Sequence, residues 1–322
     1  MDGGYAVSHR AVRSAVFMGS KPFGLAVLKA LVAAEPSLKW QILHPDDLSD
    51  ARSNFNAFQE FSETEGVSLT RVRSRAEAES LLAECDYDVG FVCGWYWLLS
   101  EKIVGPDAPP VYGIHNSLLP RYRGGAPLVW SIINGESEVG GSLFRLTLGM
   151  DDGDIALQVK VPVTQDSDIG SILEDIEVAF LKGIPTVWQD IVSGRPILTR
   201  QNHSLATYCA QRRPEDGQIN WSDSAQSIHD FIRAQSKPYP CAYTFCDADK
   251  IYLDRAEVFP GCYYGRPGQI VERKRTSITV TAGGGTAVRI IQAHDTSGET
   301  DLRTLFPAGV RLLKPNSNDV FL

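Results

Sequence analysis

Short apolar runs alternate with helical patterns along the first part of the chain, and this alternation restricts the fold most. The first run, Ala15–Met18, ends at Gly19-Ser20, and Pro22 opens a helical pattern that continues through Leu28 and Leu31. A short apolar run bounded by turn residues is typical of a buried strand. Strands that alternate with helices pair in parallel. The sequence therefore predicts an α/β fold with a doubly wound, Rossmann-like sheet.

The pattern recurs up to about Arg200 and then changes. Further strands are predicted at 40–43, 89–93, 111–114, 142–148 and 155–163, with helices at 76–84, 127–134 and 169–192. Beyond Arg200, strand-like segments are predicted at 242–245, 250–256, 268–271, 277–281 and 287–293, with one helix at 224–235. Several short strands at this spacing favour a small barrel. We expect an α/β domain over 13–203, a smaller C-terminal β-barrel over 204–312, and tails at 1–12 and 313–322.

Composition excludes several classes of protein. The 322 residues are 43% hydrophobic and 22% charged, as in an ordinary globular protein. No run of about eighteen apolar residues could span a membrane, and the start lacks the apolar core of a signal peptide. The net charge of −8 disfavours a broad nucleic-acid-binding face, although a local basic patch remains open. We expect a cytoplasmic protein with no membrane partner.

The cysteines do not suggest a metal site. The chain has 6 of them, none forms a C-x-x-C pair, and no histidine lies beside them at zinc-finger spacing. We therefore expect reduced, mostly structural thiols and no metal.

His115 is the first candidate for chemistry. It ends an apolar strand, and a polar side chain at the carboxyl end of a strand lies where open α/β folds bind ligands. The basic, glycine-rich segment Arg121–Gly125 follows, and it suits the close approach of an anionic substrate. A histidine bonded only to a backbone carbonyl explains the position about equally well.

Asp151 is the second candidate. It lies in the turn Asp151-Asp152-Gly153-Asp154, also at the end of a predicted strand. Acids beside glycine often only stabilise turns, and the order of acids does not match a calcium loop. If Asp151 reaches His115, it favours the imidazolium and raises the pKa of the histidine. His115 would then exchange protons near neutral pH.

Other motifs are weak or absent. The chain has a lone Gly19 in place of G-x-G-x-x-G, and it has no P-loop and no G-x-S-x-G. Trp95-Tyr96-Trp97 follows a predicted strand, and we expect at least one of these rings to pack in the core. The alternative is a wall for a flat aromatic cofactor.

Together these segments resemble the 10-formyltetrahydrofolate-dependent formyltransferases. Gly113-Ile-His-Asn-Ser-Leu-Leu-Pro-Arg-Tyr-Arg-Gly-Gly-Ala-Pro127 looks like the family's signature around a catalytic histidine, and Leu148–Asp154 looks like its second signature. Met18–Phe23 is similar to the family's first strand–helix turn. Gln211–Trp221 and Lys237–Ala242 look like the start of its C-terminal, OB-like barrel. The resemblance therefore covers nearly the whole chain.

The resemblance implies roles for individual residues. His115 would be the general acid and base, Asp151 would orient it, and Asn116 is a candidate oxyanion donor. Residues implied to bind the folate are Trp97, Leu98, Leu99, Ser117, Leu118, Leu119, Pro120, Thr147, Leu148, Gly149 and Met150. Residues implied to meet the acceptor substrate are Arg121, Tyr122, Arg123 and Gly124. The cofactor would be 10-formyltetrahydrofolate, with tetrahydrofolate as the product.

Two positions depart from the family pattern. The family usually has an asparagine two residues before the histidine, as an oxyanion donor, and this chain has Gly113 there. Loss of one such donor typically costs about 10²–10³ in rate. Asn116 could replace it if the chain turns directly after His115. The sugar-modifying branch has a folate-contacting arginine where this chain has Gly125.

The resemblance leads to one expected activity and several alternatives. We expect formyl transfer to a primary amine of a small molecule, foremost an amino sugar carried on a nucleotide, and the sugar branch also suggests a homodimer. Methionyl-tRNA formylation is the first alternative, in which tRNA is the partner. Formylation of an amino-acid or siderophore amine is another. A weakly active folate-binding protein and a formyl-folate hydrolase are the remaining ones.

Overall fold

The computed structural model describes residues 12–50, 53–309 and 311–312. The tails predicted at 1–12 and 313–322 lie outside the described residues, apart from residue 12. The chain forms two compact units, each described here by itself. Unit 1 comprises Met1–Gly124, Gly140–Lys160 and Asp175–Tyr208, and unit 2 comprises Gly125–Val139, Val161–Glu174 and Cys209–Leu322.

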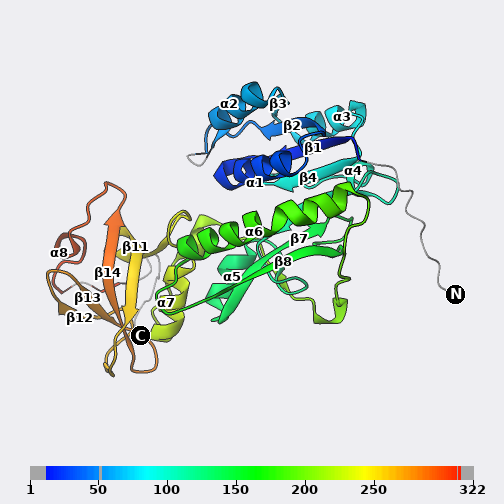
Figure 1. Ribbon diagram of the computed structural model, residues 1–322. Helices are drawn as coiled ribbons and strands as arrows, with labels where there is room; N and C mark the ends of the chain where they lie inside the picture. Colours follow the sequence, from blue (N-terminus) through cyan, green and yellow to red (C-terminus); the bar gives the residue numbers. More distant parts are fainter. Residues whose placement is uncertain (1–11, 51–52, 310, 313–322) are drawn as a thin grey trace. The chain divides into compact units, whose positions relative to one another are not determined.

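A seven-stranded sheet organises the first part of the chain, in the order β3-β2-β1-β4-β5-β7-β8 (Figure 1). Its strands are β1 Ser14–Gly19, β2 Lys39–Pro45, β3 Ser68–Val72, β4 Val89–Cys93, β5 Val111–His115, β7 Glu138–Arg145 and β8 Ile155–Pro162. The first five pair in parallel, and β7 pairs antiparallel with β5. Both faces of the central strands are buried, as parallel sheets require.

The helices connect these strands. They are α1 Lys21–Ala34, α2 Phe55–Glu65, α3 Arg75–Glu84, α4 Glu101–Val104, α5 Pro127–Ile133 and α6 Ile169–Val192. The predicted α/β domain is confirmed, and the long helix has the predicted bounds. The prediction missed α2 and β3 because each buries few residues, with only Phe58 and Phe61 on α2 and Val72 on β3 below the surface.

The strand predicted over 142–148 is wrong at its end. β7 stops at Arg145, and Leu146 bonds through its backbone N–H to Val111 as the chain enters a turn. The apolar residue Leu148 extended the predicted strand, but it is 59% exposed. The turn that carries Asp151 is therefore longer than the sequence pattern indicates.

The second part of the chain forms a five-stranded antiparallel sheet in the order β10-β11-β14-β13-β12. These strands are β10 Ala242–Cys246, β11 Asp249–Val258, β12 Ile270–Arg273, β13 Ile278–Thr281 and β14 Ala287–Asp295. The helices are α7 Ala225–Arg233 and α8 Leu302–Leu305; short segments are η1 His203–Leu205, η2 Pro214–Gly217, β6 Arg123–Gly124 and β9 Tyr208–Cys209. The separate, smaller C-terminal β domain that the sequence predicts as a barrel is confirmed as a domain with an antiparallel sheet.

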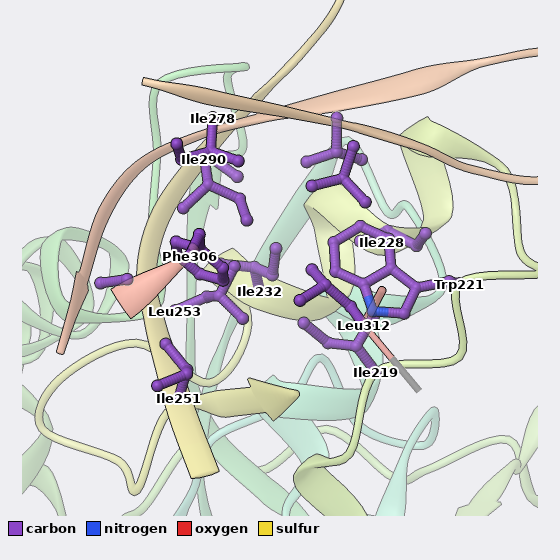
Figure 2. Packing of buried hydrophobic residues seen from close by; sticks show 14 of the residues in the cluster. Ile219, Trp221, Ile228, Ile232, Ile251, Leu253, Ile278, Ile290, Phe306 and Leu312 are labelled. Carbon is purple, nitrogen blue, oxygen red and sulfur yellow. The ribbon is translucent and has the colours of Figure 1, made fainter. Parts of the chain in front are cut away.

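One apolar core holds this sheet against α7 and the first residues of the domain. Ile228 and Ile232 of α7 belong to the same buried cluster as Leu253 and Ile290 of the sheet, and this cluster also holds Trp221 and Leu312 (Figure 2). The indole N–H of Trp221 donates a hydrogen bond to Thr244 Oγ1, so its burial leaves no unpaired donor there. The helix begins at its cap Ser224, whose hydroxyl accepts a hydrogen bond from the Ser227 N–H.

Candidate active site

His115 is the last residue of β5, at the carboxyl edge of the parallel strands. Its side chain is 11% exposed, and its ring packs edge-on against Phe144 of β7. On the same edge, Gly94 and the following loop come after β4 and Ser20 comes after β1. Because ligands of open α/β sheets bind at this edge, the structure places His115 where the sequence predicts it.

Two groups face the ring nitrogens of His115. Nε2 lies 2.8 Å from the carbonyl oxygen of Tyr122, and Nδ1 lies 3.6 Å from Oδ2 of Asp151. A carbonyl oxygen only accepts hydrogen bonds, so Nε2 carries a proton in this arrangement. A second proton on Nδ1 would point at the Asp151 carboxylate. Both contacts are satisfied together only by the imidazolium, and the neutral ring keeps an unprotonated Nδ1.

The Asp151 carboxylate is held in place by the chain that follows His115. Its Oδ2 accepts a hydrogen bond of 2.8 Å from the Gly124 N–H. Its backbone has a φ of 47°, in the left-handed region that aspartate tolerates better than most residues. The neighbouring Gly153 leaves no room for a side chain, because a Cβ there would lie 1.8 Å from the Arg145 carbonyl oxygen. The structure thus brings together His115 and Asp151, which are 36 positions apart in the sequence.

Asn116 lies directly beside His115, and the chain turns at this residue. The Ser117 N–H donates a 2.8 Å hydrogen bond to the His115 carbonyl, which closes a three-residue turn at the end of β5. The Asn116 carboxamide is half-buried and has no hydrogen-bond partner within residues 12–50, 53–309 and 311–312. The turn that its predicted role requires is therefore present.

Gly113 lies two residues earlier on β5, and a neighbour fills the space beside it. A Cβ at this position would lie 3.2 Å from Cδ2 of Leu146. The register pairs Gly113 with Phe144, so Leu146 follows directly along the adjacent chain. An asparagine here would have to displace the Leu146 side chain by a few tenths of an ångström.

The segment predicted to contact the folate directly after His115 is firmly held. Ser117 is 2% exposed and its hydroxyl donates to the Arg121 carbonyl, while Leu119 is 4% exposed. Ser142 of β7 accepts from the Leu119 N–H and donates to the Ser117 carbonyl. Gln158 of β8 donates to the Leu119 carbonyl and to Ser142 Oγ. Folate contacts by Leu118 and Pro120 stay predictions on this rigid segment.

The other predicted folate residues lie on two exposed loops. Trp97 and Leu99 pack against the core beneath the loop after β4, while Leu98 is 83% exposed. On the turn after β7, Thr147 and Gly149 are exposed together with Leu148 and Met150. The Thr147 hydroxyl donates a short hydrogen bond to Asp152. Exposed apolar side chains on these loops suit a flat ligand, and their role in folate binding stays a prediction.

The two arginines of the basic loop predicted to meet the substrate differ in their exposure to solvent. Arg121 is exposed and lies over the Tyr122 ring, whereas Arg123 is only 3% exposed. The guanidinium of Arg123 donates to Gln201 Oε1 at 2.7 Å and lies 3.1 Å from His203 Nδ1. Arg121 is thus the arginine better placed for solvent-borne anions, while the backbone N–H of Gly124 serves Asp151.

The sequence prediction missed an ion-pair network at the same edge of the sheet. Lys21, the first residue of α1, lies 2.9 Å from Asp47 and 2.8 Å from Asp50. Asp47 Oδ2 also accepts from the Tyr96 hydroxyl at 2.9 Å, and Oδ1 accepts from the Ser53 hydroxyl. These residues lie after β1, β2 and β4, and no local motif joins them. The network fixes Tyr96 next to the predicted folate residue Trp97.

The Asp47 carboxylate makes the network sensitive to acid. Burial alone would raise its pKa, but hydrogen bonds from Ser53, Lys21 and Tyr96 outweigh burial and hold the pKa below its ordinary value of 3.8. A depressed folded-state pKa stabilises the protein above the unfolded pKa, and this stability is lost as the pH falls through the folded value.

We therefore predict that Asp47→Asn lowers the free energy of unfolding at pH 7 by about 1–3 kcal/mol, because buried donors lose their charged acceptor. The difference from wild type should shrink below pH 4, as measured by urea denaturation. Asp46→Asn is the matched control, since the carboxylate of Asp46 makes only long contacts within the described residues, to Arg71 and Arg73 at 3.8 and 3.7 Å. Equal effects of the two substitutions at pH 7 would contradict the role of the network.

The described residues offer no metal site. No three His, Cys, Asp or Glu side chains among them lie close enough together to hold a metal ion.

All six cysteines are free thiols, and burial raises the pKa of Cys93 to about 12. No helix within the described ranges is both long and apolar enough to cross a membrane.

Known proteins are similar to this chain in sequence and in fold. Residues 42–187 match the formyl transferase family, and residues 212–300 match the formyl transferase C-terminal domain. A methionyl-tRNA formyltransferase of Sorangium cellulosum is 31% identical over 68% of this chain and 70% of its own length. One from Citrifermentans bemidjiense is 35% identical over 56% of this chain and 56% of its own length.

A solved structure extends the likeness to the fold. The N-formyltransferase of Helicobacter canadensis, in complex with folinic acid and dTDP-3-aminofucose, superposes with a TM-score of 0.67 at 15% identity. The match covers 87% of this chain and 99% of that one. Because both domain models match in order, and 70% of the length of the Sorangium cellulosum enzyme is matched at 31% identity, the chain belongs to the formyltransferase family of enzymes.

Proposed function

We propose that this protein transfers a formyl group from 10-formyltetrahydrofolate to a primary amine of a small molecule, foremost an amino sugar on a nucleotide. The observation that carries the proposal is the pairing of His115 with Asp151 at 3.6 Å, beside the turn at Asn116. A histidine flanked by a carboxylate and an amide donor has the parts that acyl transfer to an amine requires.

The reaction divides into addition and elimination. The acceptor amine attacks the formyl carbon, and a carbon–nitrogen bond forms while the formyl oxygen becomes an oxyanion. Asn116 donates a hydrogen bond to that oxygen. For this step the neutral His115 ring turns away from the Tyr122 carbonyl and carries its one proton on Nδ1, beside Asp151. The unprotonated Nε2 then takes a proton from the attacking nitrogen and returns it to N10 of the folate. The bond from the formyl carbon to N10 then breaks, which releases the formamide and tetrahydrofolate.

Asp151 holds the His115 ring in one orientation during this proton transfer. A carboxylate beside Nδ1 stabilises the positive charge that forms when Nε2 accepts a proton. The bond from Gly124 to Asp151 prevents the carboxylate from turning away. Gly124, which is predicted to meet the substrate, thus also holds the carboxylate that faces His115.

Charge supports a small acceptor over tRNA. The net charge is −8, whereas proteins that bind nucleic acid broadly depend on basic surfaces. Exposed Arg121 at the candidate site suits the diphosphate of a nucleotide sugar. The H. canadensis enzyme, whose structure holds dTDP-3-aminofucose, shares the fold.

Methionyl-tRNA is the second candidate acceptor. The relatives that are 31% and 35% identical to this chain are both methionyl-tRNA formyltransferases. Such an activity predicts binding that weakens steeply as salt rises, because phosphate contacts release counterions. A nucleotide-sugar enzyme would instead bind free nucleoside diphosphates with a shallow dependence on salt.

The test offers the protein 10-formyltetrahydrofolate with a panel of amino-sugar nucleotides, amino acids and methionyl-tRNA. Mass spectrometry then detects the gain of one formyl group on the acceptor. We expect the gain on an amino-sugar nucleotide. Transfer to methionyl-tRNA alone would establish the second candidate. Release of formate without a formylated acceptor would indicate a hydrolase, and folate binding without turnover would indicate a folate-binding protein.

Asp151→Asn is predicted to lower kcat by roughly 10- to 100-fold, less than the loss of the general base itself. The amide oxygen can still accept from Gly124, but it carries no charge to stabilise the imidazolium. Steady-state kinetics on the identified acceptor measures the effect. Asp154→Asn in the same turn is the control, and an equal loss there would indicate a general effect on the turn.

A further inference from the structure

The carboxamide of Gln201 joins two segments that carry the predicted site residues. Its Nε2 donates hydrogen bonds to the carbonyl oxygens of Asp151 and Gly153, at 2.8 and 2.7 Å. Its Oε1 accepts from Nη2 of Arg123 at 2.7 Å. The residue is 4% exposed, so water does not compete strongly for these bonds. One side chain therefore satisfies all of its hydrogen-bonding atoms on the two segments.

The first consequence concerns the backbone of Asp151. Its φ of 47° is a left-handed conformation that an L-residue adopts at a cost unless its surroundings hold it there. Gln201 holds the carbonyl oxygens of Asp151 and Gly153, and the Gly124 N–H holds the Asp151 carboxylate. The direction of the carboxylate towards His115 depends on both attachments.

The second consequence concerns Arg123 and its neighbours. Arg123 is 3% exposed, and its Nη2 lies between Gln201 Oε1 and His203 Nδ1. A guanidinium only donates, so His203 Nδ1 is unprotonated in this contact. The residue before Arg123 supplies the carbonyl that faces His115 Nε2, and the residue after it supplies the N–H that holds Asp151.

The segment that contains Gln201 also holds the loop around Arg123 through a second residue, Thr207. The Thr207 hydroxyl accepts a hydrogen bond of 2.8 Å from the Tyr122 N–H, and the Thr207 carbonyl accepts one of 2.8 Å from the Arg123 N–H. The segment that contains Gln201 and Thr207 thus bonds to the backbone of both residues that flank the His115 ring, Tyr122 and Asp151.

We propose that Gln201 is a positioning residue of the active site, whose carboxamide sets the Asp151 turn and the Arg123 loop at the spacing that His115 needs. The proposal rests on the proposed formyl transfer and adds a residue outside both family signatures. Gln201 acts through Asp151 and Arg123, so it should affect turnover more than folate binding.

Two substitutions separate the contacts of Gln201. Gln201→Leu removes all three hydrogen bonds, and Gln201→Glu keeps an acceptor for Arg123 while removing the donors to Asp151 and Gly153. We expect both to lower kcat by about 10- to 100-fold, the loss typical when a residue that orients the side chains of an active site is removed. KM for 10-formyltetrahydrofolate should stay near the wild-type value. Turnover by Gln201→Glu equal to that of wild type would overturn the proposal.

Gln235→Leu is a matched control for folding effects. Gln235 is also buried, donates to the Phe231 carbonyl and accepts from Arg212 Nη2, but it contacts none of the predicted catalytic residues. We expect it to shift the thermal midpoint without lowering kcat at a temperature where the protein stays folded. A fall in kcat as large as that of Gln201→Leu would reduce Gln201 to a structural residue and overturn the proposal.

A second readout does not require turnover. The ¹⁵N resonances of the His115 ring report which nitrogen carries the proton, and we expect Gln201→Leu, but not Gln235→Leu, to change their dependence on pH. An unchanged titration would overturn the positioning role. If wild type formylates no acceptor, the proposed function fails instead, and the histidine resonances alone then decide whether Gln201 positions Asp151.

Discussion

His115→Ala is expected to lower kcat by about 10²–10⁴-fold, the usual contribution of a positioned general acid and base. The imidazole is the group that can both accept the proton of the attacking amine and return it to the folate nitrogen. It lies at the end of β5, with Nε2 facing the Tyr122 carbonyl and Nδ1 facing the Asp151 carboxylate. Single-turnover kinetics would separate this chemical step from substrate binding.

A second histidine–aspartate pair supplies the control. His294 Nδ1 lies 2.7 Å from Asp254 Oδ2 in unit 2, with side chains 27% and 21% exposed. Removal of this imidazole by His294→Ala breaks a comparable ion pair without touching β5, so kcat should stay at the wild-type value. Turnover by His115→Ala at the wild-type rate would remove the proposed mechanism, whatever the acceptor proves to be.

The two signatures around His115 and Asp151 could be predicted from sequence because each is local. An apolar strand followed by a polar residue fixes where the strand ends, and a run of acids with glycine fixes a turn. Their meeting in space does not follow from the strand pairing, because β7 runs antiparallel to β5 and its last residue, Arg145, lies opposite Tyr112. The turn after β7 has to bring Asp151 back to His115. The sequence could therefore indicate the two residues, but not the path of the turn that joins them.

The supporting residues could not be predicted in this way. Gln201 is 78 positions from Arg123, and Thr207 is 85 positions from Tyr122. Their bonds depend on where the chain passes after α6, which no periodicity encodes. Lys21, Asp47 and Tyr96 likewise meet only because three parallel strands end at one edge. A polar residue with no local motif reveals its role only when the fold is known.

The departure at Gly113 has a structural counterpart that the sequence does not show. The family pattern places an asparagine there, but Leu146 lies in the space that its side chain would enter. Asn116, in the turn after the strand, has a carboxamide that makes no hydrogen bond within the described part of the chain. In the proposed mechanism the amide donor is therefore displaced along the chain by three positions, from one side of His115 to the other.

Asn116→Ala is accordingly expected to lower kcat by about 10²–10³-fold, the loss seen when one oxyanion donor is removed. The KM of the folate should change little, because the oxyanion exists only after the amine has attacked. Asn116→Asp is the sharper variant. It keeps the shape of the side chain but presents a carboxylate to the developing negative charge, so its loss should be at least as large.

A donor restored at the family's usual position tests the same idea from the opposite direction. Gly113→Asn combined with Asn116→Ala should recover part of the lost kcat, and the recovery should grow when Leu146→Ala makes room, because Leu146 Cδ2 lies only 3.2 Å from the new Cβ. Kinetics of the single, double and triple variants measure the coupling. An Asn116→Ala enzyme with undiminished kcat would show that the oxyanion takes its hydrogen bond elsewhere. The protonated His115 ring would then be the donor, and the loss of Asn116 would leave the pH dependence of the rate unchanged.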